Sequence, residues 1–269
     1  MWRLVPVLLG TLALLPVSGY AQSPPALYAA YDTYAAGFDV ARVEAAFDID
    51  RASYEIRLAY HTTGLVGFFY RGHQLNTVQG RWNADQPAPH EFYGSGAWGG
   101  EDRLTIIDYQ NGQPLIRRLT PPQEAEREPV PSVLQQNSVD TLSALAMLIR
   151  RVAETGRCEA VVHTFDGRRA SEISAHTGGM DLLPSTGRSS FAGTALRCDF
   201  VGQMLAGFRL DDSDPADRKP LQGAAWFSPM IAGAPPVPVR MRFQTRWFGE
   251  ATMYLTEATT RPSTQIAGH

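Results

Sequence analysis

The chain has 269 residues, of which 44% are hydrophobic and 19% charged, so it can bury a full core and is too apolar to be disordered. The formal net charge of −3 argues against the basic surface that nucleic-acid-binding domains carry. The 24 glycines and 19 prolines favour short strands joined by tight turns over a bundle of helices.

The first 21 residues have the composition of a secretory signal peptide. Arg3 is their only charged residue, an apolar run follows over 4–17, and small residues stand at Gly19 and Ala21. The alternative, a membrane anchor, needs about 20 apolar residues, whereas this run has about 14. We therefore expect cleavage after Ala21, a periplasmic location, and a mature chain without a transmembrane segment.

Two cysteines, Cys158 and Cys198, lie in the part of the chain that we expect to be exported. An even number of cysteines in an oxidising compartment favours a disulfide. A bridge that closes a loop of about 40 residues stabilises the fold by about 4 kcal/mol. Free thiols or metal ligands are the alternative, although neither cysteine has a CxxC partner or a histidine at ligand spacing.

Alternation of apolar and polar residues dominates the rest of the chain and predicts β-strands with one wet face. Tyr54, Ile56 and Leu58, for example, alternate with charged or small residues. The same pattern, bounded by turn residues, predicts strands at 27–35, 39–48, 53–61, 65–71, 73–82, 89–97, 103–110, 114–119, 158–165, 168–176 and 195–205, with three more at 221–227, 237–247 and 251–258.

One segment, residues 138–154, has a helical pattern instead. Ser138 or Asp140 can cap its start and Gly156 can end it. Its apolar stripe predicts that it packs on the concave face of the sheet. That stripe consists of Leu142, Leu145, Leu148, Ile149 and Val152.

The sequence contains no motif that carries a known chemistry. It lacks the signatures of serine hydrolases, zinc proteases, P-loops and dinucleotide-binding folds, so we predict no catalytic residue, no metal site and no cofactor. His61 and His73 can approach each other across one hairpin, and His163 and His176 across another. Without further ligands, these histidines are better explained as sheet-surface residues.

Two surface features leave alternatives open. Residues 64–70 are apolar on both faces of the predicted strand, so they are buried on both sides, line a cavity or touch lipid. Arg240, Arg242 and Arg246 share one strand face, which is either a wet outer surface or a site for an anionic headgroup or acidic partner.

The order of these features resembles the DUF3108 family of exported Gram-negative proteins, in the form typical of alphaproteobacteria. The more specific matches are the helix start Asp140-Thr141-Leu142-Ser143 and the hairpin Phe165-Asp166-Gly167-Arg168. The likeness covers about 27–205. It implies an exported, mostly antiparallel β protein, and the family supplies no reaction or catalytic residues.

The expected fold is mainly β: one domain over 22–269, in which a long antiparallel sheet curves into an open or spiral barrel with the helix on its inner face. Barrels of more than about eight strands leave room inside, so we predict an apolar pocket between helix and sheet. The predicted lining residues are Leu58, Tyr60, Phe68, Leu104, Ile106, Leu142, Leu145 and Ile149.

The function predicted from these features is non-enzymatic. We expect a periplasmic, envelope-associated protein that holds an apolar or lipid-like ligand or a protein partner. A periplasmic hydrolase with an unrecognised site, and a ligand-free scaffold, are the alternatives.

Overall fold

The computed structural model describes residues 26–211, 218–245 and 249–261, and these residues form one antiparallel sheet of 13 strands. The strand order is β7-β6-β5-β4-β3-β2-β1-β13-β12-β11-β10-β9-β8, and every neighbouring pair is antiparallel. The strands are β1 (Ala26–Ala35), β2 (Phe38–Ile49), β3 (Ser53–Thr62), β4 (Gly72–Asn83), β5 (Gln86–Trp98), β6 (Glu101–Gln110), β7 (Gln113–Thr120), β8 (Ala160–Phe165), β9 (Ala170–Leu183), β10 (Gly193–Ala206), β11 (Leu221–Ser228), β12 (Val237–Thr245) and β13 (Gly249–Arg261).

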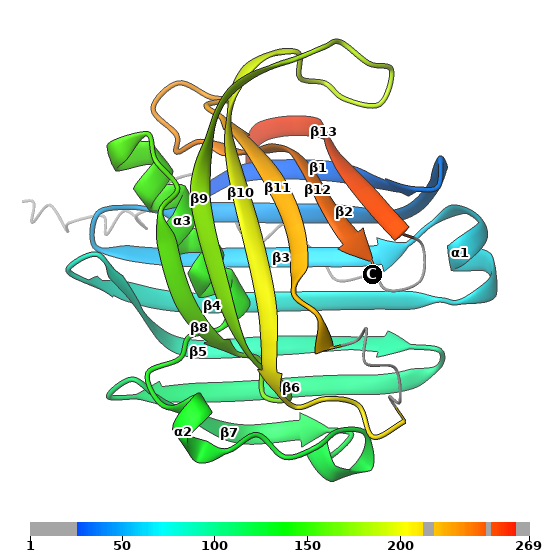
Figure 1. The fold of residues 1–269 in the computed structure, drawn as a ribbon, viewed down its shortest axis with the longest axis vertical. Helices are drawn as coiled ribbons and strands as arrows, with labels where there is room; N and C mark the ends of the chain where they lie inside the picture. Colours follow the sequence, from blue (N-terminus) through cyan, green and yellow to red (C-terminus); the bar gives the residue numbers. More distant parts are fainter. Residues whose placement is uncertain (1–25, 212–217, 246–248, 262–269) are drawn as a thin grey trace, which may run out of the picture.

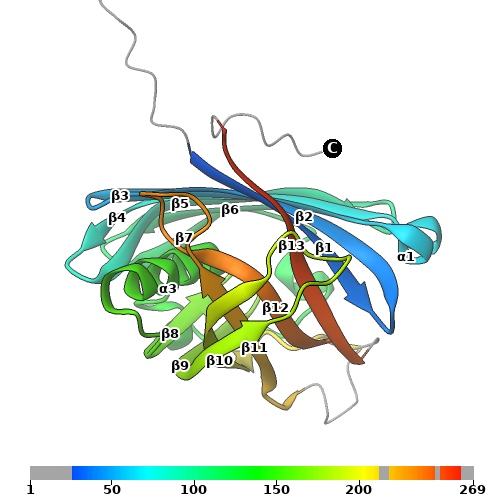
Figure 2. The same ribbon diagram turned by 90° about the horizontal axis from the view of Figure 1, so that it is seen from above.

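The sheet curls into a nearly closed barrel with two crossed layers. Strands β1–β7 form one layer and β8–β13 cross in front of it (Figures 1 and 2). Pairing of β1 with β13 joins the layers, and register shifts within β1 bend the sheet there. The predicted curved antiparallel sheet is thus confirmed.

Helix α3 (Thr141–Thr155) lies between the two layers and contacts β3, β4, β5 and β8 (Figure 2). Asp140 caps it by accepting a hydrogen bond from the Ser143 amide at 2.9 Å. Gly156 ends it with a positive φ of 65°, which a residue with a side chain rarely adopts. Both caps were predicted from the sequence, and Leu142 and Ile149 of the apolar stripe are buried in the core.

The two edge strands, β7 and β8, do not pair directly, and the chain between them closes the seam. Val139 bridges to β8, because its amide donates to His163 and its carbonyl accepts from Phe165. Glu126 binds the guanidinium groups of Arg103 and Arg168. The short helices η1 (Gln123–Ala125) and α2 (Ser132–Gln135) also lie in this connection.

The prediction of a strand at 65–71 was wrong, because helix α1 (Gly64–Phe69) connects β3 to β4 there. Gly64 has a positive φ of 54°, and a Cβ there would lie 2.4 Å from the carbonyl oxygen of Asp39, so the chain turns where only glycine fits. Phe68 is 76% exposed on this helix and does not line the barrel interior. A continuous apolar run carries no period that distinguishes strand from helix.

Several predictions fall outside the described residues: the signal peptide and its cleavage site, and Arg246 on the arginine-bearing strand. Within the described ranges, no helix is long and apolar enough to cross a membrane.

Candidate functional site

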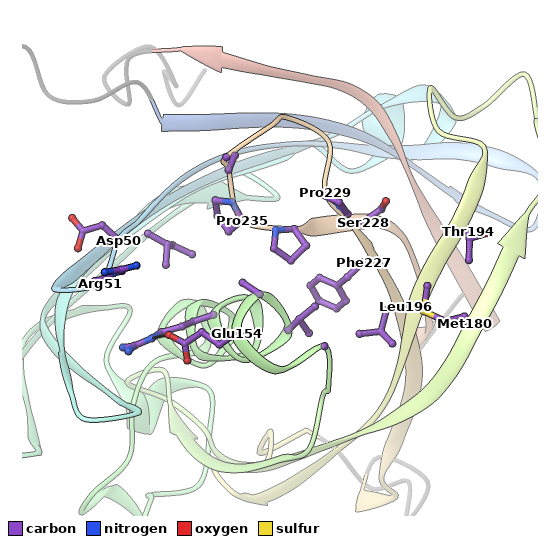
Figure 3. Close-up of a pocket in the computed structure, with 18 residues that line it drawn as sticks. Asp50, Arg51, Glu154, Met180, Thr194, Leu196, Phe227, Ser228, Pro229 and Pro235 are labelled. Atoms are coloured by element: carbon purple, nitrogen blue, oxygen red, sulfur yellow. Dashed lines mark hydrogen bonds and ion pairs between the residues drawn. The ribbon is translucent and has the colours of Figure 1, made fainter.

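A pocket of about 710 Å³ lies where the C-terminal half of α3 meets the end of the barrel (Figure 3). Three parts of the sheet complete its wall: the turn between β2 and β3, the strands β9 and β10, and the loop between β11 and β12. The pocket is lined by Ile49, Asp50, Arg51, Arg150, Val152, Ala153, Glu154, Gly156, Met180, Thr194, Leu196, Phe227, Ser228, Pro229, Gly233, Ala234, Pro235 and Pro236.

The wall of this pocket is mainly apolar. Val152 of α3 and Phe227 of β11 are buried core residues, and Leu196 of β10 packs against the same core. Three prolines, at 229, 235 and 236, stiffen the β11–β12 loop that forms one side. The pocket is therefore an extension of the hydrophobic core that opens to solvent, a surface suited to an apolar ligand.

Charged side chains stand at the rim, and most of them are already paired. Arg150 donates to Glu154 at 2.7 Å and its guanidinium lies 4.5 Å from the centre of the Trp82 ring. Asp50 accepts from the amides of Ala52 and Ser53, and these hydrogen bonds hold the pKa of its carboxyl below its usual range. These groups shape the rim and have little capacity left for a ligand.

Arg51 differs from the other charged groups at the rim. It is exposed and, among the described residues, has no carboxylate within ion-pair distance. It follows Asp50 in the β2–β3 turn, on the side of the pocket opposite Leu196 and Met180 (Figure 3). An unpaired guanidinium beside an apolar wall can bind the acidic end of an otherwise apolar molecule.

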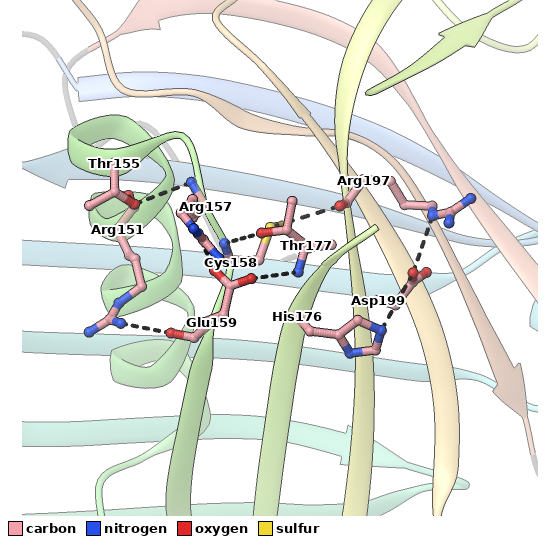
Figure 4. Close-up of a disulfide and its surroundings, with 10 residues drawn as sticks. Arg151, Thr155, Arg157, Cys158, Glu159, His176, Thr177, Arg197 and Asp199 are labelled. Carbon is pink, nitrogen blue, oxygen red and sulfur yellow. Dashed lines mark hydrogen bonds and ion pairs between the residues drawn. A yellow bond between two sulfur atoms is a disulfide. The ribbon is translucent and has the colours of Figure 1, made fainter. Parts of the chain in front are cut away.

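A disulfide holds the pocket's walls together. Cys158, three residues beyond the end of α3, is bonded to Cys198 of β10, with the Cα atoms 5.6 Å apart (Figure 4). The Cys158 amide also donates to the Thr177 hydroxyl of β9. Leu196, which lines the pocket, is two residues from Cys198, so the bridge fixes the helix end relative to the facing wall. The predicted disulfide is confirmed.

The residues predicted to line a pocket lie elsewhere. Leu142 and Ile149 are in the core, and Leu58 and Leu145 pack against it. The ring centre of Tyr60 lies 5.7 Å from that of Trp98, and burial raises the pKa of the Tyr60 phenol. None of these five lines the pocket, which lies farther towards the helix C-terminus.

The remaining three predicted lining residues do not face the core. Leu104 and Ile106 lie on the opposite face of β6 from Ile107, which is fully buried, because successive side chains of a strand alternate. Phe68 is exposed on α1. The residues that sequence reasoning missed include five in the 229–236 loop, where proline and glycine give no periodic signal.

The histidines that the structure describes do not gather at one site. His61 and His73 are opposite each other on β3 and β4, as predicted. His163 and His176 do not meet: the first lies 3.2 Å from Glu172 and the second 3.8 Å from Asp199, both exposed. The described residues contain no group of three or more histidine, cysteine or acidic side chains placed to hold a metal ion.

The arginines of β12 lie on the outer face, among aromatic rings. The Arg240 guanidinium lies 5.1 Å from the centre of the Tyr254 ring, and Arg242 lies 3.5 Å from Glu250. Arg242 is also 5.7 Å from the ring centre of Trp226.

Comparison with known proteins identifies a family and a fold. A family model described as "Protein of unknown function (DUF3108)" matches residues 28–256, beyond the 27–205 over which the likeness is visible by motif. No curated protein matches the chain. A crystal structure of a β-barrel-like protein of domain of unknown function DUF1849, from Brucella abortus, is similar with a TM-score of 0.53 and 12% identity, covering 88% of this chain and 98% of that one. At that identity the likeness shows the fold alone.

Proposed function

Because this chain belongs to the DUF3108 family, whose function is unknown, we propose a role from its own pocket: it is a non-enzymatic, periplasmic, envelope-associated protein that holds an apolar, lipid-like molecule. The observation that carries this proposal is the apolar pocket beside α3. Its volume of about 710 Å³ lies within the range of small-molecule sites, which is about 300–1,000 Å³.

The chemistry of the pocket favours a ligand with one polar end. Val152, Leu196 and Phe227 offer an apolar wall, so an acyl chain gains free energy by leaving water there. Arg51 at the rim provides a charge for an acidic end group. A ligand of this kind would lie with its chain along α3 and its headgroup towards the β2–β3 turn.

The pocket offers little to support the hydrolase alternative. Its hydroxyl groups belong to Thr194 and Ser228, and none of its lining residues is a histidine or cysteine that could act as base or nucleophile. The two carboxylates, Asp50 and Glu154, already accept hydrogen bonds from the protein. A ligand-free scaffold is disfavoured for a different reason, since a fully packed core would leave no space of this size.

The location is tested by N-terminal sequencing of the protein recovered from a periplasmic extract. We expect the sequence to begin at Gln22, because Gly19 and Ala21 form the cleavage site. A membrane-bound species that keeps Met1 would contradict the periplasmic assignment.

The ligand is tested by native mass spectrometry of the same preparation. Wild-type protein should carry a non-covalent adduct with the mass of a lipid or fatty acid. The variant Ala234→Trp, which fills the pocket, should lose it, and Ala232→Trp, outside the lining of the same loop, should keep it. An adduct retained equally by both variants would place the bound molecule elsewhere and refute the proposed site.

A further inference from the structure

Helix α1 presents a cluster of large apolar side chains to solvent. Leu65, Phe68 and Phe69 are 60%, 76% and 82% exposed, and none of the six helical residues is buried. Phe38, 58% exposed, lies at the same end of the sheet, because β2 begins where β3 ends. We call Phe38, Leu65, Phe68 and Phe69 the apolar tip. Surface clusters of this kind mark contacts with a partner or a membrane.

The apolar tip is held by a rigid base and is not a frayed loop. The Thr63 hydroxyl donates to Asp39 at 2.6 Å, and its amide donates to Val40, so the start of α1 is tied to β2. Thr62 donates to the Tyr70 carbonyl and accepts from the Gly72 amide, which closes the other end. The fold therefore fixes these apolar side chains in an exposed position.

The surroundings of the tip have the chemistry of a membrane interface. The ring centres of Tyr70 and Trp98 lie 5.9 Å apart at its base, and such rings with one polar atom are favoured at the level of lipid headgroups. Arg71 is exposed there and, within the described residues, has no carboxylate at ion-pair distance. Residues 63–72 contain no acid, and the nearby Glu101 faces Arg103 at 3.7 Å.

The position and charge of the tip favour a lipid surface over a folded partner. The tip projects at the end of the sheet, where α1 connects β3 to β4 (Figure 1). A bilayer needs no complementary shape, because its headgroup region adapts to short apolar side chains. Arg71, which has no carboxylate partner in the part of the chain that the structure describes, complements anionic headgroups.

We propose that the apolar tip inserts into an anionic lipid surface and docks the protein on the membrane. The tip is at the opposite end of β3 from the β2–β3 turn, which borders the pocket. Docking would therefore leave the pocket mouth facing away from the membrane contact. This inference does not depend on a ligand in the pocket.

Co-sedimentation with vesicles tests the docking. The protein should be the chain that starts at Gln22, since an attached apolar leader would bind vesicles by itself. Wild type should bind vesicles of phosphatidylglycerol and phosphatidylethanolamine. Phe68→Ser/Phe69→Ser should bind these vesicles at least tenfold more weakly than wild type. Arg71→Gln should bind them about fivefold more weakly at low salt, and should bind phosphatidylcholine vesicles to the same extent as wild type.

The control is Val133→Ser/Leu221→Ser, which removes two exposed apolar side chains far from α1 in sequence and should bind like wild type. Unchanged melting temperatures would show that all variants fold. The proposal fails if wild type does not bind, or if the phenylalanine variant binds as well as wild type. It also fails if sedimentation velocity shows a wild-type dimer that this variant dissociates, without vesicle binding, since the tip would then bind a second copy.

Discussion

The phenol oxygen of Tyr54 on β3 lies 2.8 Å from the hydroxyl oxygen of Ser143 in the first turn of α3, and both side chains are buried. Ser143 in turn donates to the carboxylate of Asp140 at 2.5 Å. Because an ionised carboxylate only accepts, Tyr54 must donate to Ser143 when Asp140 is charged. This chain of hydrogen bonds ties the internal helix to the wall of the barrel.

Removing either hydroxyl should destabilise the protein, and the two losses should not add. Tyr54→Phe should cost about 1 kcal/mol of unfolding free energy, and Ser143→Ala about 2 kcal/mol, because the latter leaves two buried polar groups without their partner. Urea unfolding of both single variants and the double variant measures the coupling. A coupling energy of about 1 kcal/mol is expected, and strict additivity would show that the contact contributes nothing.

Asp140 should make stability depend on pH. Burial raises the pKa of its carboxyl to about 6 from its ordinary value of 3.8. Folding therefore takes up a proton between pH 3.8 and pH 6. The contribution of Asp140 to stability is fully present below pH 3.8 and is lost as the pH rises through 6. The shift corresponds to about 2–3 kcal/mol.

The matched variant is Asp140→Asn, which keeps a capping side chain and cannot titrate. The unfolding free energy of wild type minus that of the variant should rise as the pH is lowered from 7 to 4. Other titrating groups cancel in this difference. A difference that stays flat, or falls, would contradict the assignment of a raised pKa to Asp140.

The Cys158–Cys198 bridge should contribute substantially to stability. It closes a loop with a sequence separation of 40, which corresponds to about 4 kcal/mol when the unfolded chain is otherwise unconstrained. Cys158→Ser and Cys198→Ser should each lower the unfolding free energy by a few kcal/mol, to similar extents. Reduced wild type is the control. Thiol labelling of denatured, unreduced protein should find no free thiol, and two labelled cysteines would refute the bridge.

The strands could be predicted because their alternation follows from burial of one face. Ile56 is fully buried while its neighbours Glu55 and Arg57 are partly exposed, as the pattern requires. The ends of α3 could also be predicted from the sequence, since Asp140 and Gly156 act through local backbone geometry. Features set by neighbouring residues were thus predicted well.

The pocket depended on long-range geometry and could not be placed from the sequence. Which face of β6 points inward is fixed by the barrel as a whole, and Ile106 and Ile107 are both apolar, so the pattern alone could not choose between them. The loop that carries Ala234 closes the pocket only because β11 and β12 lie across from α3. Helix α1 was missed because its run of apolar residues has no period.

The proposed function is tested most directly by titrating a fluorescent fatty-acid analogue into delipidated protein and into Ala234→Trp and Ala232→Trp. We expect saturable binding by wild type and Ala232→Trp, and binding at least tenfold weaker by Ala234→Trp, because only Ala234→Trp puts a ring into the pocket. Arg51→Gln should weaken binding of the acid more than that of the corresponding alcohol. If wild type shows no saturable binding, or if the two tryptophan variants bind equally, the pocket beside α3 is not a site for an apolar ligand.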